Sequence, residues 1–226
     1  KGGLARRASA ITAERAIAEG TVLVLDAGSA LSGTWVAVRS AGKVMVDAMG
    51  AMGYDAMAIG RMDVEVGLQA LKERQAEAAF PMLSANLVEL QSREPLFEPY
   101  TILERDGVRF GIIGLSEPET LDGPGVRDVA AWMDPLELIG PLVKEVKGQS
   151  DVVIVLSHLG MDRDHLLAQA APDINLIVGG LTRQLMEQPE REGNTLIFQQ
   201  GYRGEWLGKL VVTLDADRVP QDVRQD

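Results

Sequence analysis

Short, continuously apolar stretches alternate with longer segments of helical periodicity along most of the chain. A short apolar run that ends in Gly, Ser or His is typical of a β-strand covered on both faces. The strands predicted in this way are Thr21–Gly28, Asp55–Gly60, Val108–Ser116, Asp151–His158 and Ile174–Gly180. The helices predicted between them are roughly Leu4–Glu19, Lys43–Met52, Val64–Ala78, Pro135–Lys147 and Asp162–Ala170.

The pattern changes in the second half of the chain. A turn at Arg105-Asp106-Gly107 separates two short apolar runs, which indicates a hairpin over Tyr100–Phe110. After Gly180 only strands are predicted, at Thr195–Gly201 and Gly208–Asp215, and Glu117–Trp132 is predicted as the longest loop. We expect one α/β domain over residues 1–226 whose second half adds antiparallel strands.

Composition narrows the classes of function. Of the 226 residues, 46% are hydrophobic and 24% are charged, as in ordinary globular proteins. The chain has no cysteine, which excludes disulfides, thiolate metal ligands and cysteine nucleophiles. The net charge of -11 argues against nucleic acid as a partner, and no apolar run approaches the roughly 18 residues of a membrane span, so no membrane insertion is expected.

Four predicted strands end in glycine followed by polar residues, where the chemistry of α/β sheets is usually found. Glycine lets the backbone turn sharply and approach a ligand closely. The four strand ends are Asp26-Ala27-Gly28-Ser29, Ile59-Gly60-Arg61-Met62-Asp63, Leu156-Ser157-His158-Leu159-Gly160 and Gly179-Gly180-Leu181-Thr182-Arg183.

The order and spacing of these segments resemble the catalytic domain of the 5′-nucleotidases, which are calcineurin-like metallophosphoesterases. Further segments that carry the resemblance are Gly2-Gly3-Leu4-Ala5-Arg6-Arg7, Met52-Gly53-Tyr54-Asp55-Ala56, Phe80-Pro81-Met82-Leu83-Ser84-Ala85-Asn86 and Asp106-Gly107-Val108-Arg109-Phe110-Gly111-Ile112-Ile113-Gly114. The resemblance covers nearly the whole chain and implies a four-layer αββα sandwich with two central sheets flanked by helices.

The chemistry of that family uses two divalent ions that bind a phosphate and activate a water. Its Gly-Asp, Gly-Asn-His and Gly-His-x-His motifs supply ligands, and here these read Gly28-Ser29, Gly60-Arg61-Met62 and Gly180-Leu181-Thr182-Arg183. The former metal-site positions implied by the resemblance are therefore Ser29, Arg61, Met62, His158, Leu181 and Arg183, with His158 the only retained ligand type. The family's Asp-x-His motif would lie upstream of Gly2, so we expect the first strand to be missing from this sequence.

These substitutions argue against a two-metal centre. Hydroxyl, thioether, isobutyl and guanidinium groups are poor ligands for ions that prefer imidazole and carboxylate. Arg61 and Arg183 would each place a positive charge near the ions, and at about 4 Å this repulsion costs several kcal/mol at an effective dielectric of about 20. We expect no metal, no cofactor and no catalytic residue; the alternative is one Mn or Zn ion held with ligands upstream of Lys1.

The remaining polar residues have simpler interpretations. His158 is predicted to be a hydrogen-bonded histidine at a strand end, and His165 a solvated surface residue. Asp26 and Asp63 would pair with Arg61 and Arg183, because buried charges need partners. Alternatively, the two arginines bind a phosphate-type anion.

The sequence therefore predicts a 5′-nucleotidase-like domain that has lost its metal site and acts as a structural or protein-interaction module, with another protein or subunit as partner. The alternatives are a reduced metal-dependent phosphohydrolase acting on a nucleotide or phosphomonoester, and an oxyanion-binding protein. The family's substrate-recognition domain is not expected within this sequence. By family resemblance, the protein is expected in the periplasm or outside the cell.

Overall fold

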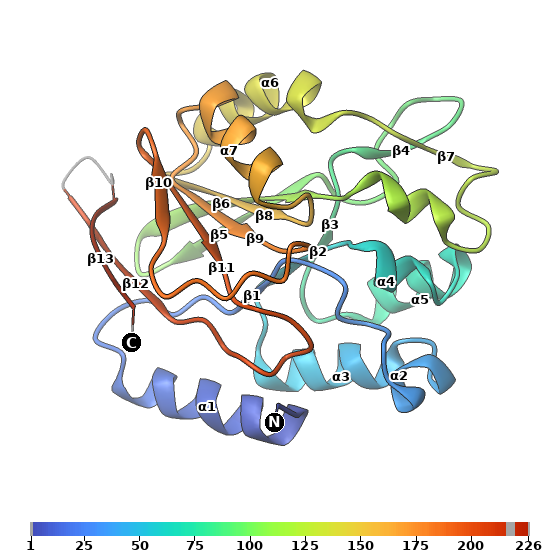
Figure 1. Ribbon diagram of the computed structural model, residues 1–226, viewed down its shortest axis with the longest axis horizontal. Coiled ribbons are helices and arrows are strands. Elements are labelled where there is room, and N and C mark those ends of the chain that lie inside the picture. Colours follow the sequence, from blue (N-terminus) through green and yellow to red (C-terminus); the bar gives the residue numbers. More distant parts are fainter. Residues whose placement is uncertain (1, 216–219, 226) are drawn as a thin grey trace.

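The computed structural model describes residues 2–215 and the backbone of 220–225, and it contains two central sheets between layers of helices (Figure 1). The smaller sheet has the order β1-β2-β3, and its strands Leu25–Asp26, Ala56–Ala58 and Met82–Leu83 are all parallel. The larger sheet has the order β10-β11-β9-β8-β6-β5. Its strands are β5 Tyr100–Arg105, β6 Val108–Leu115, β8 Val152–Ser157, β9 Leu176–Gly179, β10 Glu190–Glu192 and β11 Thr195–Gln199.

Two short pairs of strands complete the β-structure. Strand β4, Leu87–Glu89, pairs with β7, Ala130–Trp132, and β12, Leu210–Leu214, pairs with β13, Pro220–Gln225. The helices are α1 Leu4–Ile17, α2 Trp35–Arg39, α3 Lys43–Met52, α4 Arg61–Val64, α5 Leu68–Glu77, α6 Pro135–Lys147 and α7 Met161–Ala170, with a 3₁₀ turn η1 at Pro118–Asp122.

Three hydrophobic cores hold the layers together. One core joins the smaller sheet to α1, α3 and α5, and another joins the larger sheet to α6 and α7. These two groups of helices lie on opposite sides of the molecule (Figure 1). The third lies between the sheets and consists of Ala56, Ala58, Leu83, Ile112, Val152, Ile154 and Leu156. A Cβ on Gly114 would lie 2.4 Å from the Leu83 carbonyl oxygen, so the sheets are in direct contact there. The predicted αββα sandwich is confirmed.

Several predicted elements change in detail. The predicted helix Val64–Ala78 is divided between α4 and α5, because Gly67 adopts a φ of 89°. The predicted strand Thr21–Gly28 keeps only β1 as a strand, since the Val24 N–H donates to the Asp55 carboxylate, 2.8 Å away. The predicted loop Glu117–Trp132 contains η1 and β7.

The second half is not purely antiparallel. Strand β11 pairs in parallel with β9, while β10 and β11 are antiparallel. The larger sheet therefore has a parallel interior, β6-β8-β9-β11, with an antiparallel strand at each edge. A parallel interior aligns the carboxyl ends of β8 and β9 at one edge, where polar residues can meet.

Candidate functional site

The carboxyl ends of strands from both sheets meet at one cluster of polar residues. Ser29 follows β1 and Gly60 follows β2 in the smaller sheet, whereas His158 follows β8 and Gly180 follows β9 in the larger one. The Ser29 Oγ lies 3.0 Å from the His158 Nε2, and this contact joins residues 129 positions apart. The fold therefore brings together strand ends that sequence reasoning had placed at one site.

His158 is a hydrogen-bonded histidine at a strand end, as predicted. Its Nδ1 lies 2.8 Å from the Ala27 carbonyl oxygen, which can only accept, so Nδ1 carries the proton and Nε2 is left as an acceptor. His158 is 7% exposed, and this burial lowers the pKa of its imidazole. Gly60 and Gly180 pack on the ring, because a Cβ on either would lie within 2.8 Å of a ring atom.

Asp63 is fully buried, and its carboxylate accepts hydrogen bonds from backbone N–H groups. One carboxylate oxygen accepts from the Ser29 N–H at 2.7 Å and the Gly60 N–H at 2.8 Å, and the other accepts from the Leu31 N–H at 2.8 Å. Burial outweighs these hydrogen bonds and raises the pKa of Asp63 to about 7. Asp63 thus fixes the Gly28–Leu31 turn to the start of α4.

Glu117 is a site residue that the sequence interpretation missed. It is 1% exposed, its Oε1 accepts from the Arg61 N–H at 2.8 Å, and the same oxygen lies 3.6 Å from the His158 Nε2. Its Oε2 is buried with no hydrogen-bond partner among the described residues. Desolvation raises the pKa of Glu117 to about 8, so the carboxyl is mostly protonated at neutral pH. The signal that could have found it is a carboxylate just after the buried strand end at Ser116.

Known proteins with the same fold place this site in a family. The bovine (Bos taurus) 5′-nucleotidase is 36% identical over 244 residues, which cover 95% of this chain and 41% of that protein. The structure of a 5′-nucleotidase precursor from Thermus thermophilus is 30% identical, with a TM-score of 0.89 over 100% of this chain and 48% of that one. The chain belongs to the 5′-nucleotidase family of metallophosphoesterases.

A second Thermus thermophilus structure, that of the sulfate thiohydrolase SoxB, is 25% identical with a TM-score of 0.90 and covers 99% of this chain and 42% of that one. No family model matches the sequence. The chain spans about two fifths of the length of the curated relatives it matches. None of the described helices is both long and apolar enough to cross a membrane.

The positions that the resemblance assigns to metal ligands carry few groups that bind metal ions. Within the described residues, no three His, Cys, Asp or Glu side chains are grouped so that they could hold a metal ion. His158, the one imidazole at these positions, has its acceptor nitrogen against the Ser29 hydroxyl. The donor set therefore does not fit the two ions that 5′-nucleotidase chemistry requires.

The other positions carry mostly exposed side chains. Arg61 is exposed, Leu181 is 43% exposed, and the Arg183 guanidinium lies 5.5 Å from the Tyr202 ring centroid. The Met62 side chain reaches over Gly33, since a Cβ there would lie 2.7 Å from the Met62 methyl group. The backbone N–H of Arg61 donates to Glu117, and the backbone N–H of Met62 donates to Ser29.

The predicted ion pairs between the two aspartates and the two arginines are wrong. Asp63 is bonded to backbone N–H groups, and Asp26 accepts from the Gly28 N–H at 2.9 Å. Burial raises the pKa of Asp26, and in the described structure no ion pair within 4.0 Å involves Arg61 or Arg183. Backbone donors at the turns satisfy these carboxylates, and the guanidinium groups are left near solvent.

A second buried network supports the Leu181–Arg183 turn. The Ser157 hydroxyl donates to Asp164 at 2.5 Å, Gln199 Nε2 donates to the same carboxyl group at 3.1 Å, and the Thr182 hydroxyl donates to Gln199 at 2.6 Å. Asp164 is fully buried, and desolvation raises its pKa to about 7. The network ties the turn after β9 to α7 and to β11.

His165 differs from its prediction as a solvated residue. Its side chain is half-buried on α7, with Nδ1 3.2 Å from Glu192 and Nε2 2.9 Å from Glu190. The two glutamates belong to β10, so the histidine fixes the helix to the edge strand.

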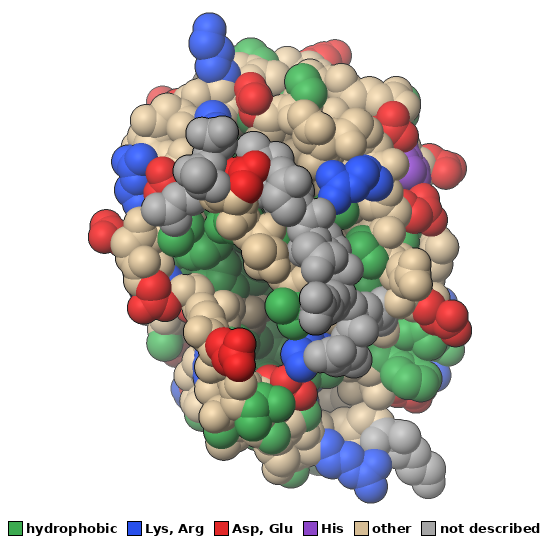
Figure 2. Space-filling model, turned by 90° about the vertical axis from the view of Figure 1, so that its left-hand side faces the viewer, with side chains coloured by type: hydrophobic (Ala, Val, Ile, Leu, Met, Phe, Trp, Pro, Cys, Tyr) green, Lys and Arg blue, Asp and Glu red, His purple; other side chains and the backbone are tan. Residues whose placement is uncertain are grey.

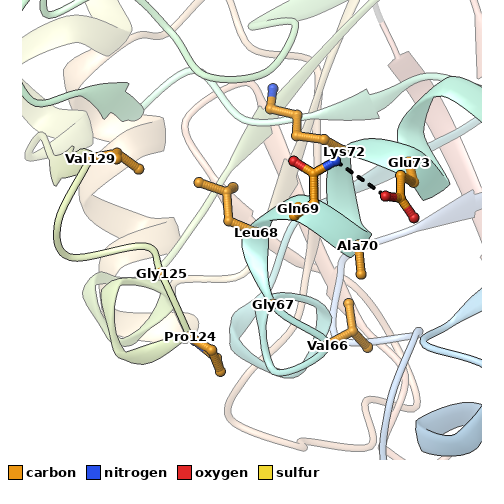
Figure 3. A pocket seen from close by; sticks show the side chains of 10 residues that line it. All are labelled: Val66, Gly67, Leu68, Gln69, Ala70, Lys72, Glu73, Pro124, Gly125 and Val129. Atoms are coloured by element: carbon orange, nitrogen blue, oxygen red, sulfur yellow. Dashed lines mark hydrogen bonds between the residues drawn. The ribbon is translucent and has the colours of Figure 1, made fainter.

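The groove in Figure 3 lies apart from this cluster. It runs between the first turns of α5 and the loop before β7, and Gln69 donates to Glu73 on its rim at 3.1 Å. Lys72 contacts the Phe97 ring and donates to the Leu96 carbonyl, so its charge is already engaged. Most of the lining is backbone or aliphatic, and the groove brings together no catalytic set of side chains.

Proposed function

We propose that this chain is a 5′-nucleotidase-type phosphoesterase domain that has lost the two-metal site and acts as a structural or protein-interaction module. The observation that carries the proposal is the hydrogen bond between the Ser29 Oγ and the His158 Nε2 at 3.0 Å. A hydroxyl stands where the family's bridging carboxylate is expected, and it occupies the imidazole nitrogen that a metal ion would need.

The electrostatics support the same conclusion. Glu117 and Asp63, the buried carboxyl groups beside His158, have pKa values raised to about 8 and about 7. A protonated carboxyl group carries no negative charge, so these two groups attract a cation less than ionised carboxylates would. The exposed Arg61 adds a positive charge that itself lowers the pKa of His158.

Two surface features support an interaction role. Figure 2 shows a hollow with hydrophobic side chains on the side where β12 and β13 lie. Helix α2 also exposes Trp35, Val36 and Val38 by 74%, 53% and 59%. Such surfaces suit another protein or subunit as the partner. By resemblance to the family, the proposed location is the periplasm or the outside of the cell.

Metal content and hydrolysis test this proposal together. The purified natural full-length protein is incubated with Mn²⁺ and Zn²⁺, washed, and examined by elemental analysis and by hydrolysis of a nucleoside monophosphate. We expect fewer than about one ion per ten chains and no metal-dependent hydrolysis. One or more tightly held ions per chain would overturn the loss of the site and favour the reduced metal-dependent phosphohydrolase.

A restored variant supplies the matched control. It carries the family's ligand types at five positions: Ser29→Asp, Arg61→Asn, Met62→His, Leu181→His and Arg183→His. We expect this variant to take up more metal than the natural protein, because carboxylate and imidazole replace hydroxyl and guanidinium. Equal uptake by both proteins would show that these positions do not determine metal binding.

The alternative of an oxyanion-binding protein rests on Arg61 and Arg183. Both are exposed, and the turns that carry them pack through Gly60 and Gly180 against His158. Calorimetric titration with inorganic phosphate tests it. Heat that disappears in the Arg61→Gln and Arg183→Gln variants would support anion binding, and no heat at millimolar phosphate would exclude it.

A further inference from the structure

Ser29 adopts a backbone conformation that is unusual for its residue type. Its φ is 63°, in the left-handed region, and it follows Gly28 with a φ of 102°. Non-glycine residues are rare in this region, and they cluster where a side chain has to be held in a defined place. The sharp turn directs the Ser29 hydroxyl from the end of β1 towards His158 on the other sheet.

The hydrogen bonds around Ser29 have a consistent direction. The His158 Nδ1–H donates to the Ala27 carbonyl at 2.8 Å, so the Nε2 lone pair faces the Ser29 Oγ. The Met62 N–H donates to the Ser29 Oγ at 3.2 Å and occupies one lone pair of the hydroxyl. The hydroxyl hydrogen is therefore directed to Nε2, which leaves the oxygen a second lone pair.

The surroundings hold this pair in place. A Cβ on Gly60 would lie 2.5 Å from the Ser29 Oγ, so only glycine fits beside the hydroxyl. Glu117 Oε1 lies 3.6 Å from Nε2 and accepts from the Arg61 N–H at 2.8 Å, so it holds the turn of Arg61 beside the ring. Ser29 is itself partly exposed, and the cationic Arg61 on the adjoining turn is exposed.

We propose that Ser29 and His158 form a metal-independent nucleophile–base pair that accepts an acyl group from small carboxylic esters. The Ser29 Oγ attacks the carbonyl carbon while its proton passes to His158 Nε2, and the bond between that carbon and the ester oxygen breaks. The leaving alcohol takes the proton from Nε2. Water then attacks the acyl-serine, His158 receives its proton and returns it to Ser29, and the carboxylic acid is released. The exposed guanidinium of Arg61 favours esters that carry an anionic group.

The site is distinct from the metal chemistry of the family, because no step uses a metal ion. The test therefore uses the natural full-length protein in EDTA, with p-nitrophenyl acetate and a fluorophosphonate as separate probes. Intact-mass and peptide mass spectrometry follow the adduct. We expect one adduct per chain on Ser29 with either probe, and none on heat-denatured protein.

Two variants and a control keep the result interpretable. Ser29→Gly removes the hydroxyl and suits the positive φ, so it should fold, and His158→Gln removes the base. We expect no labelling in the first and a loss of about a hundredfold or more in the second. Ser32→Ala removes another hydroxyl of the same loop, bonded to Glu65 at 3.0 Å, and should label as the natural protein does.

Absence of any adduct on the folded natural protein would overturn the inference, and so would labelling that persists in Ser29→Gly. Metal uptake is measured separately, so failure of the proposed function can be told apart from failure of this one. Protein that binds metal yet labels at Ser29 in EDTA would refute the lost metal site and support the nucleophile.

Discussion

Replacing Asp63 with alanine tests whether this buried carboxyl group organises the site. The substitution removes the acceptor of the Ser29, Leu31 and Gly60 N–H groups, of which the last two are buried. Each buried donor left without a partner costs about 1–3 kcal/mol. Two such donors, with the partly buried third, predict a loss of about 2–6 kcal/mol in the free energy of unfolding.

The assay is urea unfolding followed by circular dichroism at about pH 5, with Asp47→Ala as the matched control. Asp47 lies on the exposed face of α3, where it pairs with Lys43 at 2.8 Å, and such surface pairs contribute about 0–1 kcal/mol. If Asp63→Ala loses no more stability than Asp47→Ala, the interpretation of Asp63 as the clamp of the turn is wrong.

The pH dependence gives a second, independent check. The pKa of Asp63 is about 7 in the folded protein against its ordinary value of 3.8, so the folded state binds more protons between these limits. Its contribution is complete below pH 3.8 and is lost as the pH rises through about 7. The stability gap between natural protein and Asp63→Ala should therefore narrow between about pH 5 and pH 8. A gap that widens over this range would contradict the raised pKa.

Two further substitutions test the site and the packing of the sheets. The pKa of Glu117 is about 8 in the folded protein against its ordinary value of 4.5, so the natural protein loses stability as the pH rises between these values. The gain in melting temperature of Glu117→Gln over the natural protein should therefore grow from pH 5 to about pH 8.5. The control Glu119→Gln, on the exposed side of η1, should show no such trend. Gly114→Ala places a Cβ 2.4 Å from the Leu83 backbone oxygen and should cost about 1–3 kcal/mol in urea unfolding. The control is Gly140→Ala in α6, where an added Cβ would have no atom within 4 Å. This variant should be neutral or stabilised by up to about 1 kcal/mol. Equal losses of stability in both variants would rule out the close contact of the sheets.

Hydrophobic periodicity was sufficient for the main elements because it reports burial directly. Lys43–Met52 and Pro135–Lys147 match α3 and α6 residue for residue, since each combines an apolar face with a clear end signal. Short strands such as Met82–Leu83 were not resolved, because two residues carry no period. The parallel pairing of β11 with β9 is a tertiary choice that local pattern does not contain.

The candidate site was predictable only in its position. Strand ends rich in glycine indicated where Ser29, Gly60, His158 and Gly180 would meet, and the structure confirms that meeting. The roles of the carboxyl groups were not predictable, because a buried aspartate can be paired with a charged side chain or with backbone N–H groups, and the sequence does not show which. Asp63 illustrates this, since its bonds reach residues 32 and 34 positions away.

The 129-residue separation of Ser29 and His158 also bears on how the chain folds. Contacts between distant residues form slowly, since the loop between them has to close before it is stabilised. The clamp made by Asp63 joins residues much closer in sequence and can form while the larger sheet is still incomplete. We therefore expect the smaller sheet and its turn to order early in refolding, and the imidazole to reach the serine only when β8 has docked.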